Sequence, residues 1–218
     1  MSIKKLLIKS IIYIVGLFIM ALGVSFSINS KLGISPVNSI PYVVSNSFNL
    51  DLGIMITLVF GIIILLQILI LRREFKIYNL SQIIFSYLFG FFTDFTGMIL
   101  GDFKIPTYFG SLIMLLISII LIALGLTTYV STKLINMPIE GLIEAIKYKY
   151  FPQKSFGYIK IIVDVTMVVA AIAISFIFLG RIEGIREGTA LSAIFVGYFV
   201  KIFTKIIVPF EEKLENIN

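Results

Sequence analysis

Long runs of apolar residues, separated by short polar stretches, dominate the hydrophobic pattern of this chain. A helix that crosses a bilayer needs about 20 consecutive, mostly apolar residues. By that criterion the sequence predicts six transmembrane helices, at Ile11–Ile28, Gly53–Leu71, Leu80–Leu100, Tyr108–Val130, Gly157–Leu179 and Thr189–Val208. The predicted fold class is an all-α, polytopic membrane protein. We expect a single membrane domain over residues 1–218, ending in a short cytoplasmic tail at 209–218.

The same residue spacing occurs twice along the chain. Ala21-Leu22-Gly23, Lys31-Leu32 and Pro36 are reproduced by Ala123-Leu124-Gly125, Lys133-Leu134 and Pro138, with Ser25 aligned to Thr127 and Ser30 to Thr132. More loosely, Gly53 aligns with Gly157, and Phe89-Gly90-Phe91-Phe92 with Val196-Gly197-Tyr198-Phe199. This pattern indicates a duplication, with repeat 1 at about 8–100 and repeat 2 at about 108–208. Because each repeat holds an odd number of spans, the two repeats are predicted to be inverted.

In each repeat the first span is followed by a proline and by a segment too short to cross the membrane. These segments are Pro36–Phe48 and Pro138–Tyr150. The second is predicted to be an interfacial amphipathic helix, whose apolar stripe lies opposite its polar residues: Ile139, Leu142, Ile143 and Ile146 against Glu140, Glu144 and Lys147. The first contains a second proline, Pro41, and is polar and broken. It is either interfacial or half-inserted, because irregular backbone at membrane depth must be buried in protein or line a cavity.

Composition supports the membrane class and excludes several chemistries. Of the residues, 59% are hydrophobic and 14% charged, which leaves too little polar surface for a water-soluble domain. The chain has neither cysteine nor histidine, so disulfides and sulfur or imidazole metal sites are excluded. An aspartyl pair of Asp94 and Asp164 is not expected, because neither lies in a Gly-x-Gly-Asp context and they sit toward opposite faces. We therefore predict no enzyme activity, catalytic residue, metal or cofactor.

The basic residues predict the orientation of the chain. With six alternating spans, most cations fall on one side: Lys4, Lys5, Lys9, Arg72, Arg73, Lys76, Lys133, Lys147, Lys149, Lys154, Lys205 and Lys213. By the positive-inside rule, both termini are predicted to be cytoplasmic in a bacterial inner membrane. The net charge of +6 is thus assigned to lipid headgroups and not to nucleic acid. The first span is expected to be retained and not cleaved as a signal peptide, since the repeat runs through it.

Three charged residues lie well away from the ends of the predicted spans, where an unpaired charge is costly. They are Asp94, Asp164 and Lys201. Asp164 and Lys201 lie at similar depth and could form an ion pair near the inner interface, with the Lys201 side chain extending toward the lipid headgroups. The repeat aligns Asp94 with Lys201, and Asp94 is expected to face a cavity. Small residues four apart, Ala21 with Ser25 and Ala171 with Ser175, and the aligned glycines Gly90 and Gly197 are expected where helices approach closely.

A polar site is predicted where the first short segment meets the turn before the last span. The turn exposes unsatisfied N–H groups at a helix start beside the fixed charge of Arg186, which suits an anionic group. The candidate substrate-binding residues are Ser35, Asn38, Ser39, Asp94, Arg186, Glu187, Gly188 and Thr189. Pro36, Pro138, Glu140, Asp164 and Lys201 are assigned structural or gating roles, and Glu140 is expected to meet Arg72 or Arg73. A second interpretation remains open, in which Glu187 and Thr189 only cap the helix and Arg186 only pairs with a neighbouring acid.

Three segments resemble a known family. Lys31-Leu32-Gly33-Ile34-Ser35-Pro36-Val37-Asn38, the Gly53 region and Gly184-Ile185-Arg186-Glu187-Gly188-Thr189 are similar to signature segments of the YczE/YyaS/YitT-type bacterial membrane proteins. The resemblance implies a multi-pass inner-membrane protein of the kind often described as a transporter. In that family the proline is typically followed by an aromatic and an acidic residue, whereas Val37 and Asn38 stand here.

Two function classes follow from these features. Inverted repeats, two non-spanning segments and buried charges favour a secondary transporter for a small solute, anionic or zwitterionic. The alternative is a non-transporting membrane partner, such as the substrate-binding subunit of a larger uptake or regulatory complex, or a duplicated scaffold. The expected partners are the lipid bilayer, an unknown small solute, and a second copy or another membrane subunit.

Overall fold

The computed structural model describes residues 3–216, with side chains described through residue 209. It contains eight α-helices: α1 (Ile3–Ser30), α2 (Pro36–Phe48), α3 (Leu52–Leu71), α4 (Gln82–Leu100), α5 (Tyr108–Ser131), α6 (Pro138–Tyr150), α7 (Phe156–Leu179) and α8 (Glu187–Asn216). Two short 3₁₀ helices, Arg72–Glu74 and Ile77–Ser81, join α3 to α4. Residues 3–216 contain no β-strand, which confirms the predicted all-α class.

Six of these helices are long and apolar enough to span a bilayer, as predicted: α1, α3, α4, α5, α7 and α8. The main differences lie at the two chain ends, where α1 begins at Ile3 and α8 continues through Pro209 to Asn216. Hydropathy marks the bilayer-crossing part of a helix, whereas lysine and glutamate also favour helix beyond it. Much of the predicted tail is therefore helical, while residues 217–218 and the side chain of Lys213 lie outside the described part.

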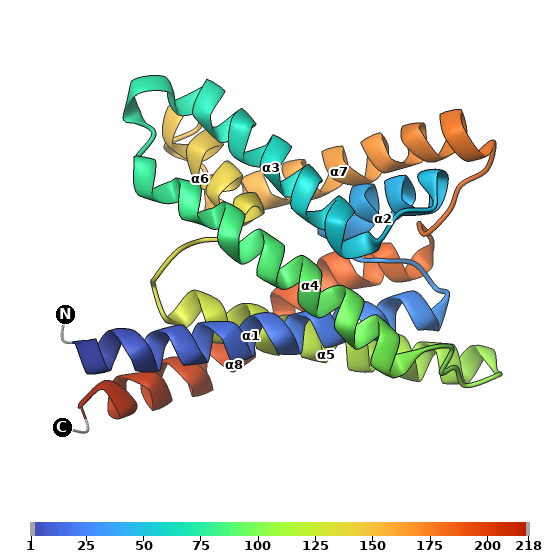
Figure 1. The fold of residues 1–218 in the computed structure, drawn as a ribbon, viewed down its shortest axis with the longest axis horizontal. Coiled ribbons are helices and arrows are strands. Elements are labelled where there is room, and N and C mark those ends of the chain that lie inside the picture. The colour runs from blue at the N-terminus through green and yellow to red at the C-terminus, as the bar shows by residue number, and fades with distance from the viewer. Residues whose placement is uncertain (1–2, 217–218) are drawn as a thin grey trace.

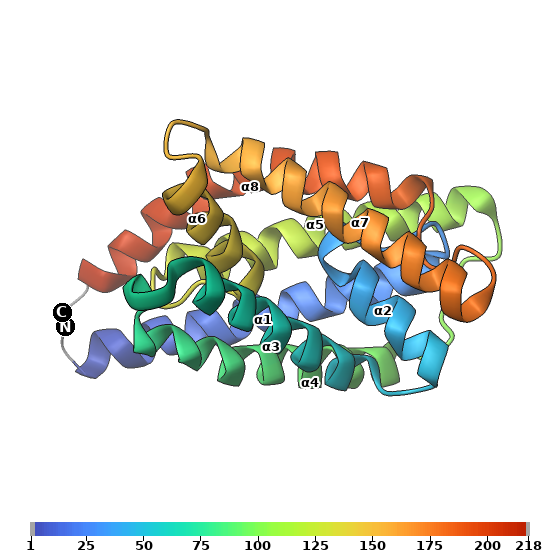
Figure 2. The ribbon, with the colours of Figure 1, turned by 90° about the horizontal axis from the view of Figure 1, so that it is seen from above.

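Both chain ends lie at the same end of the long axis (Figure 1). We call the end where α1 begins and α8 finishes the proximal end, and the opposite end, which contains residues 31–35 and 180–186, the distal end. The six long helices run back and forth between these two ends (Figures 1 and 2). This arrangement agrees with a multi-pass membrane protein.

The centre of the fold is the crossing of α1 and α5, which pack along much of their length (Figure 2). Gly16, Gly23 and Gly125 make the close approach possible. A Cβ atom added to Gly125 would lie 2.5 Å from the carbonyl oxygen of Gly16, and one added to Gly23 would lie 2.8 Å from the Ile122 nitrogen. Gly23 and Gly125, which align in the sequence, each pack against the other helix of this pair, Gly23 against Ile122 and Gly125 against Gly16.

The remaining helix contacts come in corresponding pairs. Helix α1 packs against α4, and α5 packs against α8. Helix α2 packs against α7 and α3, while α6 packs against α3 and α7. The largest contact without a counterpart is that of α3 along α4, because α7 and α8 make almost no contact.

The glycines explain this difference. A Cβ on Gly90 would lie 2.3 Å from the carbonyl oxygen of Gly53, so α3 and α4 touch backbone to backbone. The aligned residues Gly157 and Gly197 have nothing within 4 Å of the corresponding position. Close approach was therefore predicted correctly for Gly90 and wrongly for Gly197, because α8 stands away from α7.

The two short helices have the predicted bounds, since the fixed φ of Pro36 and Pro138 suits a first helical position. Both begin near the middle of the molecule and run to opposite ends, α2 to the distal end and α6 to the proximal end (Figure 2). Helix α2 is continuous through Pro41, which corrects the expectation of a broken segment; a proline removes one hydrogen bond without ending the helix.

Helix α6 buries the apolar stripe that its sequence predicted. Ile139, Leu142 and Ile143 are buried, and Ile146 packs against the core. Glu140, which was expected on the exposed polar face, instead has its Oε2 atom buried. The first turn of α6 thus lies inside the helix bundle, and only its later turns present an exposed polar face.

Candidate functional site

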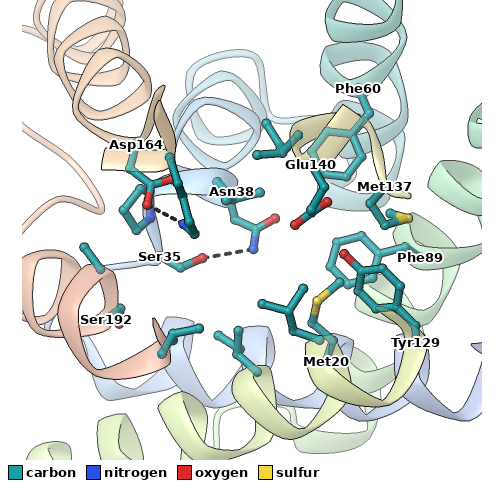
Figure 3. A pocket seen from close by; sticks show the side chains of 18 residues that line it. Met20, Ser35, Asn38, Phe60, Phe89, Tyr129, Met137, Glu140, Asp164 and Ser192 are labelled. Carbon is teal, nitrogen blue, oxygen red and sulfur yellow. Dashed lines mark hydrogen bonds and ion pairs between the residues drawn. The ribbon is translucent and has the colours of Figure 1, made fainter. Parts of the chain in front are cut away.

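A cavity of about 60 Å³ lies in the middle of the molecule, where α2 and α6 begin (Figure 3). Its lining draws on all eight helices and on the residues just before α2 and α6. Most of the wall is apolar, including Met20, Phe60 and Phe89. Seven lining side chains carry polar groups: Ser35, Asn38, Tyr129, Glu140, Lys160, Asp164 and Ser192. A polar group buried in an apolar interior requires a partner, so this combination marks a candidate ligand site.

Asn38 and Glu140 occupy corresponding positions in the two short helices. Each is the third helical residue, two positions after its proline. The Asn38 Nδ2 donates to Ser35 Oγ at 3.1 Å, while its Oδ1 has no partner. The first turns of α2 and α6 both reach this cavity, so two helix N-termini meet there.

Glu140 carries a carboxylate at this N-terminus. Its Oε2 is buried and accepts no hydrogen bond. Burial raises the pKa of the Glu140 carboxyl, an effect opposed by its own backbone N–H, by Lys160 and by Tyr129, while the charge of Asp164 adds to it. The site thus contains an acceptor oxygen that the protein leaves unsatisfied.

Two residues of α7, Lys160 and Asp164, form an ion pair in the cavity wall (Figure 3). They are four residues apart and so share one face of the helix. The Lys160 ammonium donates to Asp164 Oδ2, and Asp164 Oδ1 has no partner. The predicted pair of Asp164 with Lys201 is wrong, because the nearer lysine on the same helix is the partner and Lys201 is exposed on α8.

Two hydroxyl groups complete the polar lining. The Tyr129 hydroxyl on α5 and the Ser192 Oγ on α8 are buried and have no hydrogen bond within 3.5 Å, although Tyr129 lies close enough to the Glu140 carboxyl to affect its pKa. Neither residue was singled out in the sequence, and neither was Lys160. The four-residue spacing of Lys160 and Asp164 was a detectable signal, whereas Tyr129 and Ser192 were hidden among many hydroxyl residues of apolar helices.

The predicted site residues of repeat 1 separate in the structure. Ser35 and Asn38 line the cavity. Ser39 is buried, and its Oγ donates to the Pro36 carbonyl at 2.6 Å within α2. Asp94 lies at the crossing of α3 and α4, where its Oδ1 accepts from the Gly53 N–H at 2.8 Å. Asp94 therefore tethers the start of α3.

The predicted residues of the distal turn lie outside the cavity lining. Arg186 Nη1 donates to the Lys31 carbonyl at 3.0 Å, and Nη2 pairs with Glu187 at 3.1 Å in an exposed ion pair. The Gly188 N–H donates to the Leu32 carbonyl at 2.7 Å, and buried Thr189 accepts from the Arg186 N–H at 3.4 Å. These contacts join the turn before α8 to the loop after α1.

A second opening lies at the proximal end. This proximal vestibule has a volume of about 960 Å³ and is lined by residues of α3, α4, α5, α6 and α8 and of the segments that join α3 to α4 and α5 to α6. Gln67 and Gln82 lie on its wall and bond to each other at 2.9 Å, and Gln67 also donates to the Pro138 carbonyl at 3.0 Å. The first turn of α6 thus stands between vestibule and cavity, since Gly141 lines the former and Glu140 the latter.

The expected contact of Glu140 with Arg72 or Arg73 does not form. Both arginines are exposed in the 3₁₀ segment after α3, and Glu140 faces the central cavity instead. In the part of the chain that the structure describes, no cluster of carboxylates is arranged to hold a metal ion.

Comparison with known proteins gives a family. Residues 7–205 match the family described as "Family of unknown function (DUF6198)". The chain is 33% identical over 147 residues to the "Uncharacterized membrane protein YczE" of Bacillus subtilis (strain 168), an alignment covering 67% of this chain and 66% of that protein, just under two thirds of its length. No solved structure matches. The chain therefore belongs to this family of YczE-type membrane proteins, whose function is unknown.

Proposed function

We propose that this chain is a secondary transporter for a small solute, working by alternating access around the central cavity. The observation that carries the proposal is a buried cavity with unpaired polar atoms at the middle of six apolar spans. Secondary transporters place their substrate sites near the bilayer midplane, between discontinuous helices of two repeats. Helices α2 and α6, which begin at the cavity, would supply the discontinuous elements.

The helix contacts support inverted repeats as the framework. With α1–α4 matched to α5–α8, the packing of α1 on α4 corresponds to that of α5 on α8. The packing of α2 on α7 likewise corresponds to that of α6 on α3. The two short helices run to opposite ends, which is what a two-fold axis in the membrane plane requires (Figure 2). We propose this axis at the crossing of α1 and α5.

The two ends of the molecule support alternating access. At the distal end, the Ile34 N–H donates to the Gly184 carbonyl at 2.9 Å, so the loops of the two repeats are tied together. Two residues of the proximal end are the sequence counterparts of distal loop residues. Asn136 aligns with Ile34. Asn79 aligns with Arg186 when Gly90 is aligned with Gly197. Asn136 and Asn79 both line the wide proximal vestibule. We infer a state closed distally and open proximally, with its mirror state as the other half of the cycle.

The orientation in the membrane is also proposed. The proximal end carries the lysine-rich start of α1 and the basic segment Arg72–Lys76. The positive-inside rule favours this end as cytoplasmic. The state open at the proximal end would then face the cytoplasm.

A second candidate function is a non-transporting membrane subunit. Two features favour it. Only 11% of the apolar window of α8 is buried within the chain, and α7 and α8 make almost no contact with each other. Such a surface suits contact with lipid or with another membrane helix. A subunit of this kind would copurify with a partner and would move no solute alone.

Transport is tested with purified protein in liposomes. The proteoliposomes are incubated with an isotopically labelled bacterial metabolite extract, and the retained solutes are identified by mass spectrometry. Because the chain has no cysteine, the pair Asn79→Cys and Asn136→Cys can be cross-linked selectively across the proximal vestibule. We expect solute accumulation that stops on cross-linking and returns on reduction.

Each single-cysteine variant is the matched control and should be unaffected by oxidation. Accumulation that continues in the cross-linked protein would contradict alternating access through this vestibule. No accumulation of any solute above that of empty liposomes would contradict transport and favour the membrane-subunit function.

A further inference from the structure

We infer that the central cavity binds a protonated amino group, so that the solute is a small amine or a zwitterion with a free amino group. The inference rests on the proposed function in that it names the substrate class of the same site. It begins from the buried polar atoms that lack partners, since a buried acceptor or donor is costly unless a ligand or water satisfies it.

The unpaired atoms are mainly acceptors. Asn38 Oδ1, Glu140 Oε2 and Asp164 Oδ1 line the cavity without a hydrogen-bond partner. The exposed fractions of Asn38 and Asp164 are 4% and 6%. Amide and carboxylate oxygens accept hydrogen bonds and do not donate when ionised. A ligand that satisfies all three must bring hydrogen-bond donors, and an ammonium group brings three N–H donors together with a positive charge.

The charges point the same way. Lys160 is the one cation in the cavity lining of the described chain, and it already pairs with Asp164. The Glu140 carboxylate then has no cationic side chain of its own at the site. A positive ligand group would offset this charge, whereas an anionic group would add a second uncompensated negative charge.

The two helix N-termini do not reverse this preference. The N-terminus of α6 favours a nearby negative charge, and the carboxylate of Glu140, the third residue of the helix, already provides that charge. At the start of α2, the uncharged Asn38 occupies the corresponding position. The start of α2 offers few free donors to an anionic group, because Pro36 has no N–H and the Asn38 N–H donates to the Ser35 carbonyl at 3.0 Å.

The size of the cavity limits the solute. A volume of about 60 Å³ accommodates a few water molecules or an ammonium head group. Tyr129 and Ser192, with exposed fractions of 1% each, provide hydroxyls that accept a further N–H. The rest of a larger solute would extend toward the proximal vestibule.

The probe for this site is methylammonium. Thermal unfolding of the detergent-purified protein is followed in amine-free phosphate buffer, with methylammonium chloride, tetramethylammonium chloride, sodium chloride or sodium acetate at equal ionic strength. A ligand that binds the folded state raises the apparent Tm. We expect a saturable rise with methylammonium alone, because tetramethylammonium has the charge but no N–H donor.

Glu140→Gln should abolish this rise, because it removes the charge and keeps the shape. Glu144→Gln is the matched control on the same helix, since Glu144 is exposed and bonds to Asn136. It should keep the wild-type response. Asn38→Ala supplies a second cavity variant and should weaken the response if Glu140→Gln does not yield folded protein.

Three results would overturn the inference. The first is that methylammonium does not raise the Tm. The second is that sodium raises the Tm equally and that this rise also depends on Glu140. The third is that Glu140→Gln leaves the methylammonium-induced rise in Tm unchanged. Amine binding without solute accumulation in liposomes would leave the inference standing and contradict transport. Accumulation of a solute without an amino group would contradict the inference and leave transport standing.

Discussion

The distal and proximal ends of this molecule carry aligned sequence segments in different arrangements. At the distal end, the Gly188 N–H bonds to the Leu32 carbonyl, and α3 touches α4 through Gly53 and Gly90. At the proximal end, the aligned residue Leu134 borders a vestibule of about 960 Å³, and α7 stands apart from α8. A smaller pocket of about 260 Å³, lined by Ile34, Gly184 and Arg186 among others, remains at the distal end. The aligned segments therefore give a tighter packing at the distal end and a wider opening at the proximal end.

Comparing the two ends identifies the contacts that make the distal packing tighter. The closed end combines backbone hydrogen bonds between loops with a tether from Asp94 to the Gly53 N–H. The residue aligned with Asp94 is Lys201, which cannot accept such a bond. The two ends are thus chemically unequal despite the repeat, and the closed distal packing is built from contacts that the proximal end lacks.

The largest expected effect comes from filling the two aligned glycine positions. Gly90→Ala should lower the free energy of unfolding by about 1–3 kcal/mol, because its Cβ would lie 2.3 Å from the Gly53 carbonyl oxygen. Gly197→Ala meets open space and should cause no loss. Thermal or denaturant unfolding of the detergent-purified variants measures both. Equal losses would show that the ends do not differ at these glycines.

The accessibility of the central cavity from each side is a second test of the difference between the proximal and distal ends. Ser192→Cys places a single thiol in the cavity wall of a chain without cysteine. A small, membrane-impermeant thiol reagent should label it many times faster from the proximal side than from the distal side. Sealed vesicles of opposite orientation provide the measurement. Faster labelling from the distal side would reverse the assignment of open and closed ends.

The buried carboxyl makes stability depend on pH. Because burial raises the pKa of Glu140 in the folded state, the native protein binds more protons than the unfolded chain above the usual carboxyl range. Stability from this group therefore falls as pH rises through the folded pKa. Glu140 faces Lys160 and Asp164 from α7, Tyr129 from α5 and Tyr13 from α1.

Glu140→Gln removes this titration. In amine-free buffer we expect the variant to be more stable than the wild type at pH 8, with the difference shrinking toward pH 5. The melting temperature of both proteins across that pH range gives the test. A wild-type curve parallel to that of Glu140→Gln would show that the carboxyl is not destabilised by its burial. Glu144→Gln, at an exposed position, should follow the wild type.

The smallest effect is expected at the distal turn. Arg186→Gln removes an exposed ion pair with Glu187 and a bond to the Lys31 carbonyl, which together should contribute less than about 1 kcal/mol to stability. We also expect it to leave ligand-induced stabilisation unchanged, because Arg186 lies outside the cavity lining. Loss of that response would restore the earlier hypothesis that Arg186 binds an anionic group of the solute.

The sequence by itself determined the class, the six spans and the two short helices. Long apolar runs can only satisfy their backbone groups in a bilayer as helices, and Pro36 and Pro138 fix where α2 and α6 begin. It also identified Ser35, Asn38, Glu140 and Asp164 as residues of interest, the first two as binding residues and the others as structural or gating residues. These residues stand out because polar groups are rare near apolar spans.

Only the tertiary structure decided how those residues are grouped. Asp164 pairs with Lys160 and not with Lys201, Glu140 faces the cavity, and Arg186 lies at the distal end. Hydropathy gives depth along a helix but not the rotation of one helix against another, and that rotation selects which side chains share a cavity. For the same reason two glycine pairs that align in the sequence differ in the structure. Gly53 and Gly90 form a tight helix crossing, whereas Gly157 and Gly197 have open space around them.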